Sequence, residues 1–244
     1  MRHFGLIGRK LGHSFSRQYF SDKFNNEGID ATYKLIEIDE IAAIRSLIQD
    51  DKLLCGLNVT IPYKESVIPY LDELSQEAAS IGAVNCISIN NGHTKGYNTD
   101  IEGISTTLDK LNIAPTTEAL ILGTGGASKA VAHVLNNRNI PFISISRESS
   151  RGDITYDDLS AEIISNHKLI INTTPLGMYP NIESCPAIDY SAINSSHKIF
   201  DLVYNPEPTL FMKRCTECGA ECIGGTLMLH TQAEASWRIW QQFK

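Results

Sequence analysis

Two ionisable residues stand where proton-transfer chemistry would need them. Lys64 lies near the end of LNVTIPYKE, residues 57–65, a segment whose first half has the apolar alternation of a β-strand and whose strand pattern Pro62 interrupts. Asp100 ends the segment NTD, where a helical pattern begins. Taken singly, the lysine is equally well explained as a surface residue and the aspartate as a helix cap.

An ammonium and a carboxylate together suit the interconversion of an alcohol and a ketone. A lysine in a dry site has a lowered pKa and is able to exchange a proton with the alcohol oxygen. A neighbouring carboxylate orients the ammonium and raises its pKa. Whether Lys64 acts as base, acid or electrostatic anchor stays open at this level.

A glycine turn in LILGTGGASKA has the setting of a dinucleotide site. Gly123, Gly125 and Gly126 follow an apolar strand pattern and precede a helical one, so that backbone N–H groups and the helix dipole face a pyrophosphate. Ser128 takes the place of the usual third glycine, and the alternative is an ordinary strand-to-helix turn.

The next strand pattern, PFISIS, runs into SRESSR. Arg147 and Arg151, with Ser146 and Ser149 beside them, form a set of donors suited to the 2′-phosphate of NADP. Glu148 favours NAD if it turns inward, and a solvated charged loop is the bland alternative. The arginines nevertheless favour NADP over NAD.

Composition narrows the class of protein. The 244 residues are 42% hydrophobic and 20% charged, which indicates one or two globular domains. A net charge of −7 is the wrong sign for a nucleic-acid partner. With no signal-peptide pattern and no long apolar run, we expect a cytoplasmic protein that does not bind membranes. We also expect a monomer or homodimer.

Six cysteines are expected to be free thiols, because a chain of this size without a secretion signal needs no disulfides. Cys215, Cys218 and Cys222 are clustered, but no second C-x-x-C or histidine pair supplies further ligands. We therefore expect no metal.

The elements that position these residues form two α/β halves. Alternating strand and helix patterns predict a parallel, doubly wound sheet in the second half, with strands near residues 118–123, 141–146, 168–174 and 198–204. The first half has its own α/β pattern, with a helix expected from about residue 64 to 74 and a hairpin turning at Asn90, Asn91 and Gly92. The boundary is expected at about residue 100.

Eight segments, in order along nearly the whole chain, make it resemble the shikimate dehydrogenase family, which interconverts 3-dehydroshikimate and shikimate with NADP(H). They are GHSFS, LNVTIPYKE, GAVN, NTD, GTGGAS, INTTPLGM, DLVYNPEPT and GGTLMLHTQA. The resemblance implies two α/β domains with the site in a cleft between them. These are a substrate-binding and catalytic domain, residues 1–100 completed by a C-terminal helix at 226–244, and a Rossmann-like NADP-binding domain at 101–225.

The same resemblance implies residue roles. Lys64 and Asp100 form the catalytic pair, and the substrate side comprises Ser14, Ser16, Asn58, Thr60, Asn85, Tyr204 and Gln232. The cofactor positions are Gly123, Thr124, Gly125, Gly126, Ala127, Ser146, Arg147, Ser149, Arg151, Thr174, Leu202, Gly225 and Met228.

Two alternatives to this function remain, and departures from the family pattern bear on the first. Ser146 stands in place of an asparagine and Glu148 in place of a small hydroxyl residue, which keeps a quinate/shikimate dehydrogenase that uses NAD in view. A dinucleotide-binding redox sensor without catalysis is a second alternative. The segment GDITYDDLS after Arg151 is short for the usual helix and strand, so the outer edge of the nucleotide sheet is expected to be reduced.

Overall fold

The protein folds into two compact units. The computed structural model describes residues 1–12, 14–114 and 116–242. The first unit comprises residues 1–99 and 233–244, and the second comprises residues 100–232. The chain passes from one to the other between Thr99 and Asp100, and the last helix is divided between the two units. The end of that predicted helix, residues 243–244, lies outside the described residues.

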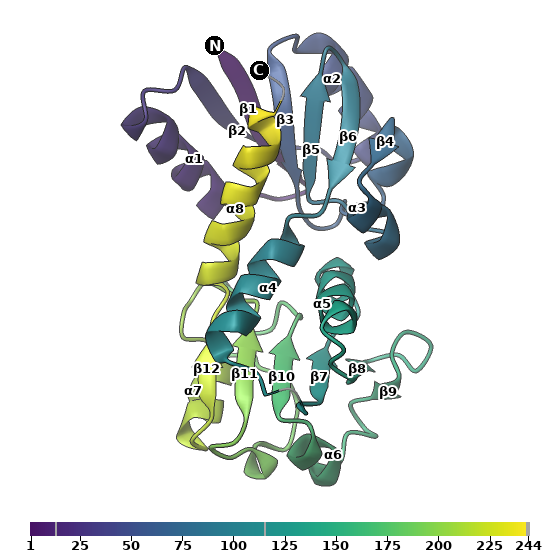
Figure 1. Cartoon of the computed structure of the whole chain (residues 1–244), viewed down its shortest axis with the longest axis vertical. Coiled ribbons are helices and arrows are strands. Elements are labelled where there is room, and N and C mark those ends of the chain that lie inside the picture. Colours follow the sequence, from purple (N-terminus) through teal and green to yellow (C-terminus); the bar gives the residue numbers. More distant parts are fainter. Residues whose placement is uncertain (13, 115, 243–244) are drawn as a thin grey trace. The chain divides into compact units, whose positions relative to one another are not determined.

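The first unit is built on a mixed sheet (Figure 1). The strands lie in the order β2 (Ala31–Glu37), β1 (Arg2–Gly8), β3 (Leu54–Val59), β5 (Cys86–Asn90), β6 (His93–Tyr97) and β4 (Glu73–Leu74). β1 runs parallel to β2 and β3, whereas β5 runs antiparallel to β3 and β6. The carboxyl ends of β1, β3 and β6 therefore meet the amino end of β5 at one edge.

Aromatic side chains hold α1 (Phe15–Asn26) on this sheet. Phe20 and Phe24 lie one turn apart on the helix, and both are buried against Phe4 and the C-terminal tryptophans. The ring centroids of Phe4 and Trp240 are 4.8 Å apart. The other helices of this unit are α2 (Ile44–Asp50), after the 3₁₀ turn Ile41–Ala43, and α3 (Gln76–Ile81).

The expected helix from residue 64 to 74 is wrong. Residues 64–67 form turns, and a 3₁₀ turn, Ile68–Tyr70, leads into β4. Pro69 lacks the N–H that would donate to the carbonyl of Glu65 in an α-helix, which interrupts a regular helix here. The hydroxyl of Tyr63 anchors the segment by donating to the carbonyls of Ile38 and Asp39, at 2.6 and 2.8 Å.

The hairpin between β5 and β6 is confirmed. Asn91 and Gly92 connect the strands with φ of 51° and 83°, the left-handed backbone that a two-residue turn of this kind needs. Asparagine and glycine tolerate that conformation best. The turn therefore sets the register that brings Tyr97 opposite Cys86.

The second unit contains a parallel, doubly wound sheet, as predicted. The strand order is β12 (Glu221–Ile223), β11 (Lys198–Asp201), β10 (Leu169–Asn172), β7 (Ala119–Leu122), β8 (Phe142–Ser146) and β9 (Ile154–Thr155). The chain adds β7, β8 and β9 toward one edge of the sheet and β10, β11 and β12 toward the other, so the strand order reverses between β7 and β10. β9 has only two residues, which fits the expected reduction of this edge.

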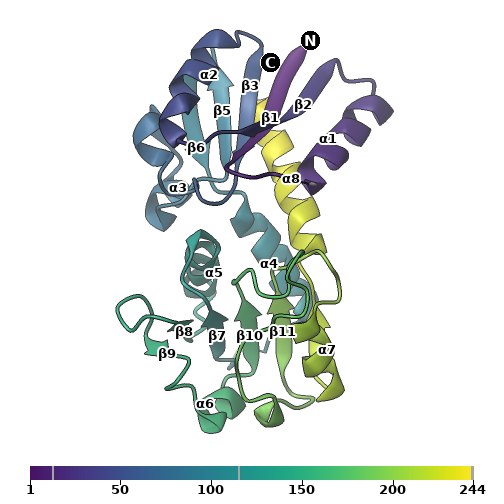
Figure 2. The ribbon, with the colours of Figure 1, turned by 180° about the vertical axis from the view of Figure 1, so that it is seen from behind.

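Helices cover both faces of this sheet, as Figures 1 and 2 show from opposite sides. α4 (Asp100–Leu111) and α5 (Gly126–Asn137) pack with one set of strand residues, including Ile171 and Phe200. α6 (Ala161–Asn166) and α7 (Leu210–Glu217) pack with the alternate set, including Ile170 and Ile199. Strands buried on both faces explain the continuous apolar runs of the sequence.

α8 (Thr226–Gln241) is divided because its two ends are buried in different cores. Met228 belongs to the core of the second unit, and Trp237 and Trp240 belong to the aromatic core of the first. No helix among the described residues is both long and apolar enough to span a bilayer.

Candidate functional site

Polar side chains gather at one edge of the first unit's sheet. Thr60 follows the end of β3 directly, and Lys64, half-buried, follows in the turns held by Tyr63. The backbone N–H of Val84 donates to the carbonyl of Lys64 at 2.7 Å, which joins the lysine segment to the start of β5. The chain segments that carry the expected substrate-side residues of this unit therefore meet at the same edge of its sheet.

Ser14 and Ser16 lie at the beginning of α1. Ser14 occupies the N-cap position with an extended backbone, but its side chain makes no capping hydrogen bond. A helix N-terminus of this kind suits a carboxylate ligand. Ser16 is buried and hydrogen-bonds with the hydroxyl of Tyr33.

Asn58 is the centre of a buried network. Its Oδ1 accepts from the Tyr33 hydroxyl at 2.8 Å, and its Nδ2 donates to the Asn85 carbonyl at 3.2 Å and to the Ser236 hydroxyl at 2.9 Å. With both ends of the amide engaged and only 4% of the residue exposed, Asn58 supports its neighbours by fixing their positions.

Asn85 extends this network to the end of the first unit. Its Oδ1 accepts from the backbone N–H of Thr99 at 2.7 Å and from the Thr99 hydroxyl at 3.2 Å. The hydroxyls of Thr99 and Ser236 are 3.2 Å apart. Segments from five regions of the chain are therefore locked together, which gives this edge a fixed polar surface.

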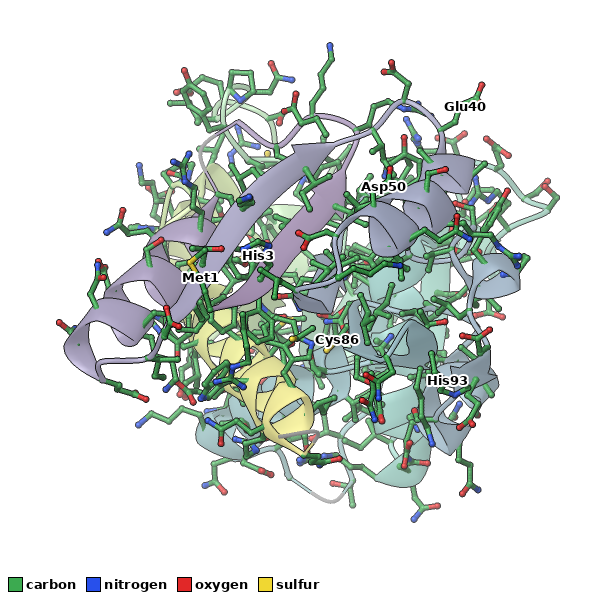
Figure 3. All side chains as sticks on the ribbon, turned by 90° about the horizontal axis from the view of Figure 1, so that it is seen from above. Met1, His3, Glu40, Asp50, Cys86 and His93 are labelled. Carbon is green, nitrogen blue, oxygen red and sulfur yellow. The ribbon has the colours of Figure 1, made fainter. Side chains whose placement is uncertain are left out.

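Burial keeps two groups beside this network protonated, the Tyr33 hydroxyl and the Cys86 thiol. It raises the pKa of the Tyr33 hydroxyl well above its ordinary value, so Tyr33 stays a donor. Burial also raises the pKa of Cys86 to about 12, although Ser236 and Trp240 oppose the change. Cys86 (Figure 3) is therefore a protonated, unreactive thiol.

In the second unit, the glycine loop lies between β7 and α5. Gly123 has φ of 106°, and a Cβ there would lie 2.8 Å from Oγ1 of Thr173. A Cβ on Gly125 would meet nothing within 4 Å, so the backbone of this exposed residue is open to approach. Thr124, Gly126 and Ala127 complete the turn into α5. The arrangement fits a pyrophosphate at a helix N-terminus.

The basic loop after β8 starts beside the glycine loop. Ser146 is buried, and its Oγ lies 3.4 Å from Oγ1 of Thr124 and accepts from the backbone N–H of Glu148 at 3.2 Å. Arg147, Glu148, Ser149 and Arg151 are all exposed. With Ser150, which is also exposed, the loop thus presents two guanidinium groups and two hydroxyls, together with one carboxylate, to solvent.

Three further loops meet at the carboxyl edge of the same sheet. The N–H of Leu202 donates to the carbonyl of Asn172 at 3.0 Å, and the N–H of Gly225 donates to the carbonyl of Val203 at 3.1 Å. A Cβ on Gly225 would lie 2.3 Å from the Leu202 carbonyl oxygen, so only glycine permits this approach. Thr174 lies in the loop after β10. The predicted cofactor residues of these loops are therefore neighbours.

Asp100, Met228 and Gln232 occupy the helices that flank this edge. Asp100 is buried at the first position of α4, one turn before Gly103. A Cβ on Gly103 would lie 2.6 Å from the backbone oxygen of Met228, so α4 approaches the first turn of α8 closely. Gln232 follows Met228 by one turn, and both are largely buried. Burial raises the pKa of Tyr204, which follows β11.

The six cysteines are all free, as predicted. Burial raises the pKa of the Cys215 and Cys222 thiols, which makes both poor nucleophiles at neutral pH. Within the described part of the chain, no three histidine, cysteine or acidic side chains are arranged to hold a metal ion.

Sequence comparison now decides the family. Residues 6–87 match the model of the shikimate dehydrogenase substrate binding domain. A relative from Methanococcus maripaludis (strain C6 / ATCC BAA-1332), a shikimate dehydrogenase (NADP⁺), is 38% identical over 97% of this chain and 90% of its own. The chain belongs to the shikimate dehydrogenase family. The ordered set of motifs had indicated this membership, which is thereby confirmed.

Solved structures of the family share the fold. A shikimate dehydrogenase from Thermus thermophilus, in complex with NADP(H) and shikimate, has a TM-score of 0.89 at 26% identity and covers 99% of this chain and 94% of its own. A quinate dehydrogenase from Corynebacterium glutamicum, in complex with NAD, has a TM-score of 0.88 at 27% identity over 99% and 94%.

The sequence patterns did not point to three residues that build the polar edge of the first unit's sheet and the carboxyl edge of the second unit's sheet. Ser236 lies one turn after Gln232, and a serine within an apolar helix face was the signal available for it. Asn172 and Asp201 each end an apolar strand, LIIN and KIFD, at the same register position of neighbouring parallel strands. That position at the carboxyl edge was the signal.

Proposed function

We propose that the chain catalyses the reversible NADPH-dependent reduction of 3-dehydroshikimate to shikimate. The observation that carries the proposal is the similarity over nearly the whole chain to relatives named shikimate dehydrogenase (NADP⁺). The polar edge of the first unit and the nucleotide cradle of the second supply the two kinds of binding group that such a reaction needs.

For the cofactor, the proposal assigns the glycine loop to the pyrophosphate and the basic loop to the 2′-phosphate. Arg147 and Arg151 are exposed cations with planar donor groups, which suit a phosphate better than a ribose hydroxyl. Bound NADPH supplies the hydride. The cofactor residues that remain, in the loops after β10 and β11 and at the start of α8, are Thr174, Leu202, Gly225 and Met228.

For the substrate, the proposal assigns Ser14, Ser16 and Tyr204 to the carboxylate. Thr60, Asn85 and Gln232 contact hydroxyls, and Asn58 fixes its neighbours through its engaged amide. Lys64 and Asp100 form the catalytic pair that handles the proton of the alcohol oxygen. The double substitution of this pair tests their coupling, because residues that act on one proton give non-additive losses.

The direct test follows NADPH absorbance when shikimate and NADP⁺ are mixed with the protein. We expect turnover, and we expect Lys64→Ala to lower kcat by roughly 10²- to 10⁴-fold with little change in urea stability. Lys52→Ala is the matched control, because Lys52 is an exposed lysine of the same unit. Absence of turnover by the unaltered protein from neutral to alkaline pH would refute the function.

One observation favours a second candidate, a quinate/shikimate dehydrogenase that uses NAD. Glu148 is exposed in the loop assigned to the 2′-phosphate, where a carboxylate favours the hydroxyls of NAD. A quinate dehydrogenase is also among the similar folds. The kcat/KM values for both acids with both cofactors distinguish the candidates, and a preference for quinate with NAD⁺ would select the second.

We also propose that the protein works in the cytoplasm as a monomer or homodimer. The free thiols support a reducing compartment. Fractionation of the source cells and light scattering of the purified protein test the two statements.

A further inference from the structure

A buried carboxylate lies beneath the loops assigned to the cofactor. Asp201 ends β11, is 0% exposed, and accepts three hydrogen bonds. Its Oδ1 accepts from Nδ2 of Asn172 at 2.9 Å and from the N–H of Val203 at 3.1 Å, and its Oδ2 accepts from the Thr209 hydroxyl at 2.6 Å. Asn172 and Thr209 are also 0% exposed.

The carboxylate fixes the polarity of the Asn172 amide. Because an ionised carboxylate only accepts, Asn172 must turn its Nδ2 toward Asp201. Its Oδ1 then faces Thr174 and accepts from the backbone N–H at 3.0 Å and from the hydroxyl at 2.6 Å. The Thr174 oxygen in turn accepts from the N–H of Leu176 at 3.3 Å. A reversed amide would place a donor against the N–H of Thr174.

The same carboxylate also fixes the loop that reaches α8. The N–H of Val203 is held by Asp201, and the carbonyl of Val203 accepts from Gly225 just before α8 begins. Leu202, which lies between Asp201 and Val203 in the sequence, donates its N–H to the Asn172 carbonyl. One side chain is thus bonded directly, or through a single residue, to the three segments that carry Thr174, Leu202 and Gly225.

We propose that Asp201 is a positioning residue for the dinucleotide: its carboxylate holds the loops after β10 and β11 and the turn before α8 in the arrangement that binds NADP(H). This inference rests on the proposed function, since it needs the cofactor at this edge of the sheet. Asp201 acts through Asn172 and Val203 and is not itself assigned a contact with the cofactor.

The test compares Asp201→Ala with His197→Ala. His197 precedes the other end of β11, is also 0% exposed, and hydrogen-bonds the Ile164 carbonyl through Nε2 at 3.1 Å. Both variants lose a buried hydrogen-bonding group, one at each end of β11, so both should unfold at lower urea concentration. Only Asp201→Ala should raise the Kd for NADPH, by about tenfold or more, as measured by fluorescence titration.

A second variant, Asn172→Ala, keeps the test decisive if Asp201→Ala does not fold. It disconnects Thr174 from the carboxylate but leaves the bonds from Val203 and Thr209 intact, and it too should raise the NADPH Kd. Wild-type affinity in a folded Asp201 or Asn172 variant, or an equal rise in the His197 variant, overturns the inference. Failure of the unaltered protein to bind NADPH would instead overturn the proposed function.

Discussion

The substitutions Gly125→Ala and Gly123→Ala should separate the effect of the glycine loop on cofactor binding from its effect on stability. Gly125 has φ of −88° and open space around a built Cβ, so an alanine fits the cofactor-free protein. We expect its stability to stay within about 0.5 kcal/mol or to rise by about 0.4–1 kcal/mol, because the unfolded chain loses freedom. The methyl group would nevertheless stand where a phosphate must approach the backbone.

Gly123→Ala should instead act mainly on the stability of the protein. The residue has φ of 106°, and its Cβ would lie within 3 Å of the Thr173 and Thr174 side chains. The strained backbone costs about 1–3 kcal/mol, which corresponds to a thermal midpoint lower by roughly 2–12 °C for a chain of this size. The fold of the loop itself thus requires glycine at Gly123, whereas the approach of the ligand requires it at Gly125.

Thermal unfolding without cofactor and titration with NADPH measure the two effects. For Gly125→Ala we expect an unchanged or slightly higher midpoint and a Kd at least about tenfold higher, a loss of ~1.4 kcal/mol. An unchanged Kd would refute the placement of the pyrophosphate on this loop. A midpoint lowered as far as in Gly123→Ala would refute the assignment of open space around Gly125.

Three further predictions concern the core, the basic loop and pH. Gly56→Ala would place a Cβ 2.2 Å from Nε1 of Trp240 and should cost about 3 kcal/mol of unfolding free energy in urea, because a group added to a packed core forces its neighbours to shift. Arg147→Ala combined with Arg151→Ala should raise the Kd for NADPH about 10- to 100-fold but leave that for NADH unchanged, and equal losses would contradict a 2′-phosphate site. Burial raises the pKa of Asp201 from 3.8 to about 6, so the native state holds this proton more tightly than the unfolded state. Stability from this group should therefore fall by about 3 kcal/mol as pH rises from about 4 to 6, and urea titrations should show that slope disappearing in Asp201→Asn.

Local sequence patterns were sufficient for most elements of the fold. The apolar runs around residues 119–122, 169–172 and 198–201 lie on strands buried on both faces, and such strands keep a continuous pattern. The hairpin at Asn91 and Gly92 was equally readable, because left-handed backbone restricts the choice of residues. Residues 64–74 failed, since a helix-compatible composition did not outweigh Pro69 and the anchored Tyr63.

The sequence by itself determined the α/β class, the glycine loop, the basic loop and, through eight ordered motifs, the family. These features depend on residues close together in the chain, whose spacing alone carries the physical constraint. Only the tertiary structure decided that Asn58 is a fully engaged support, that Ser236 completes its network and that Asp201 holds three loops. Each of these depends on partners from distant segments, and hydrogen bonds across such separations leave no local pattern to read.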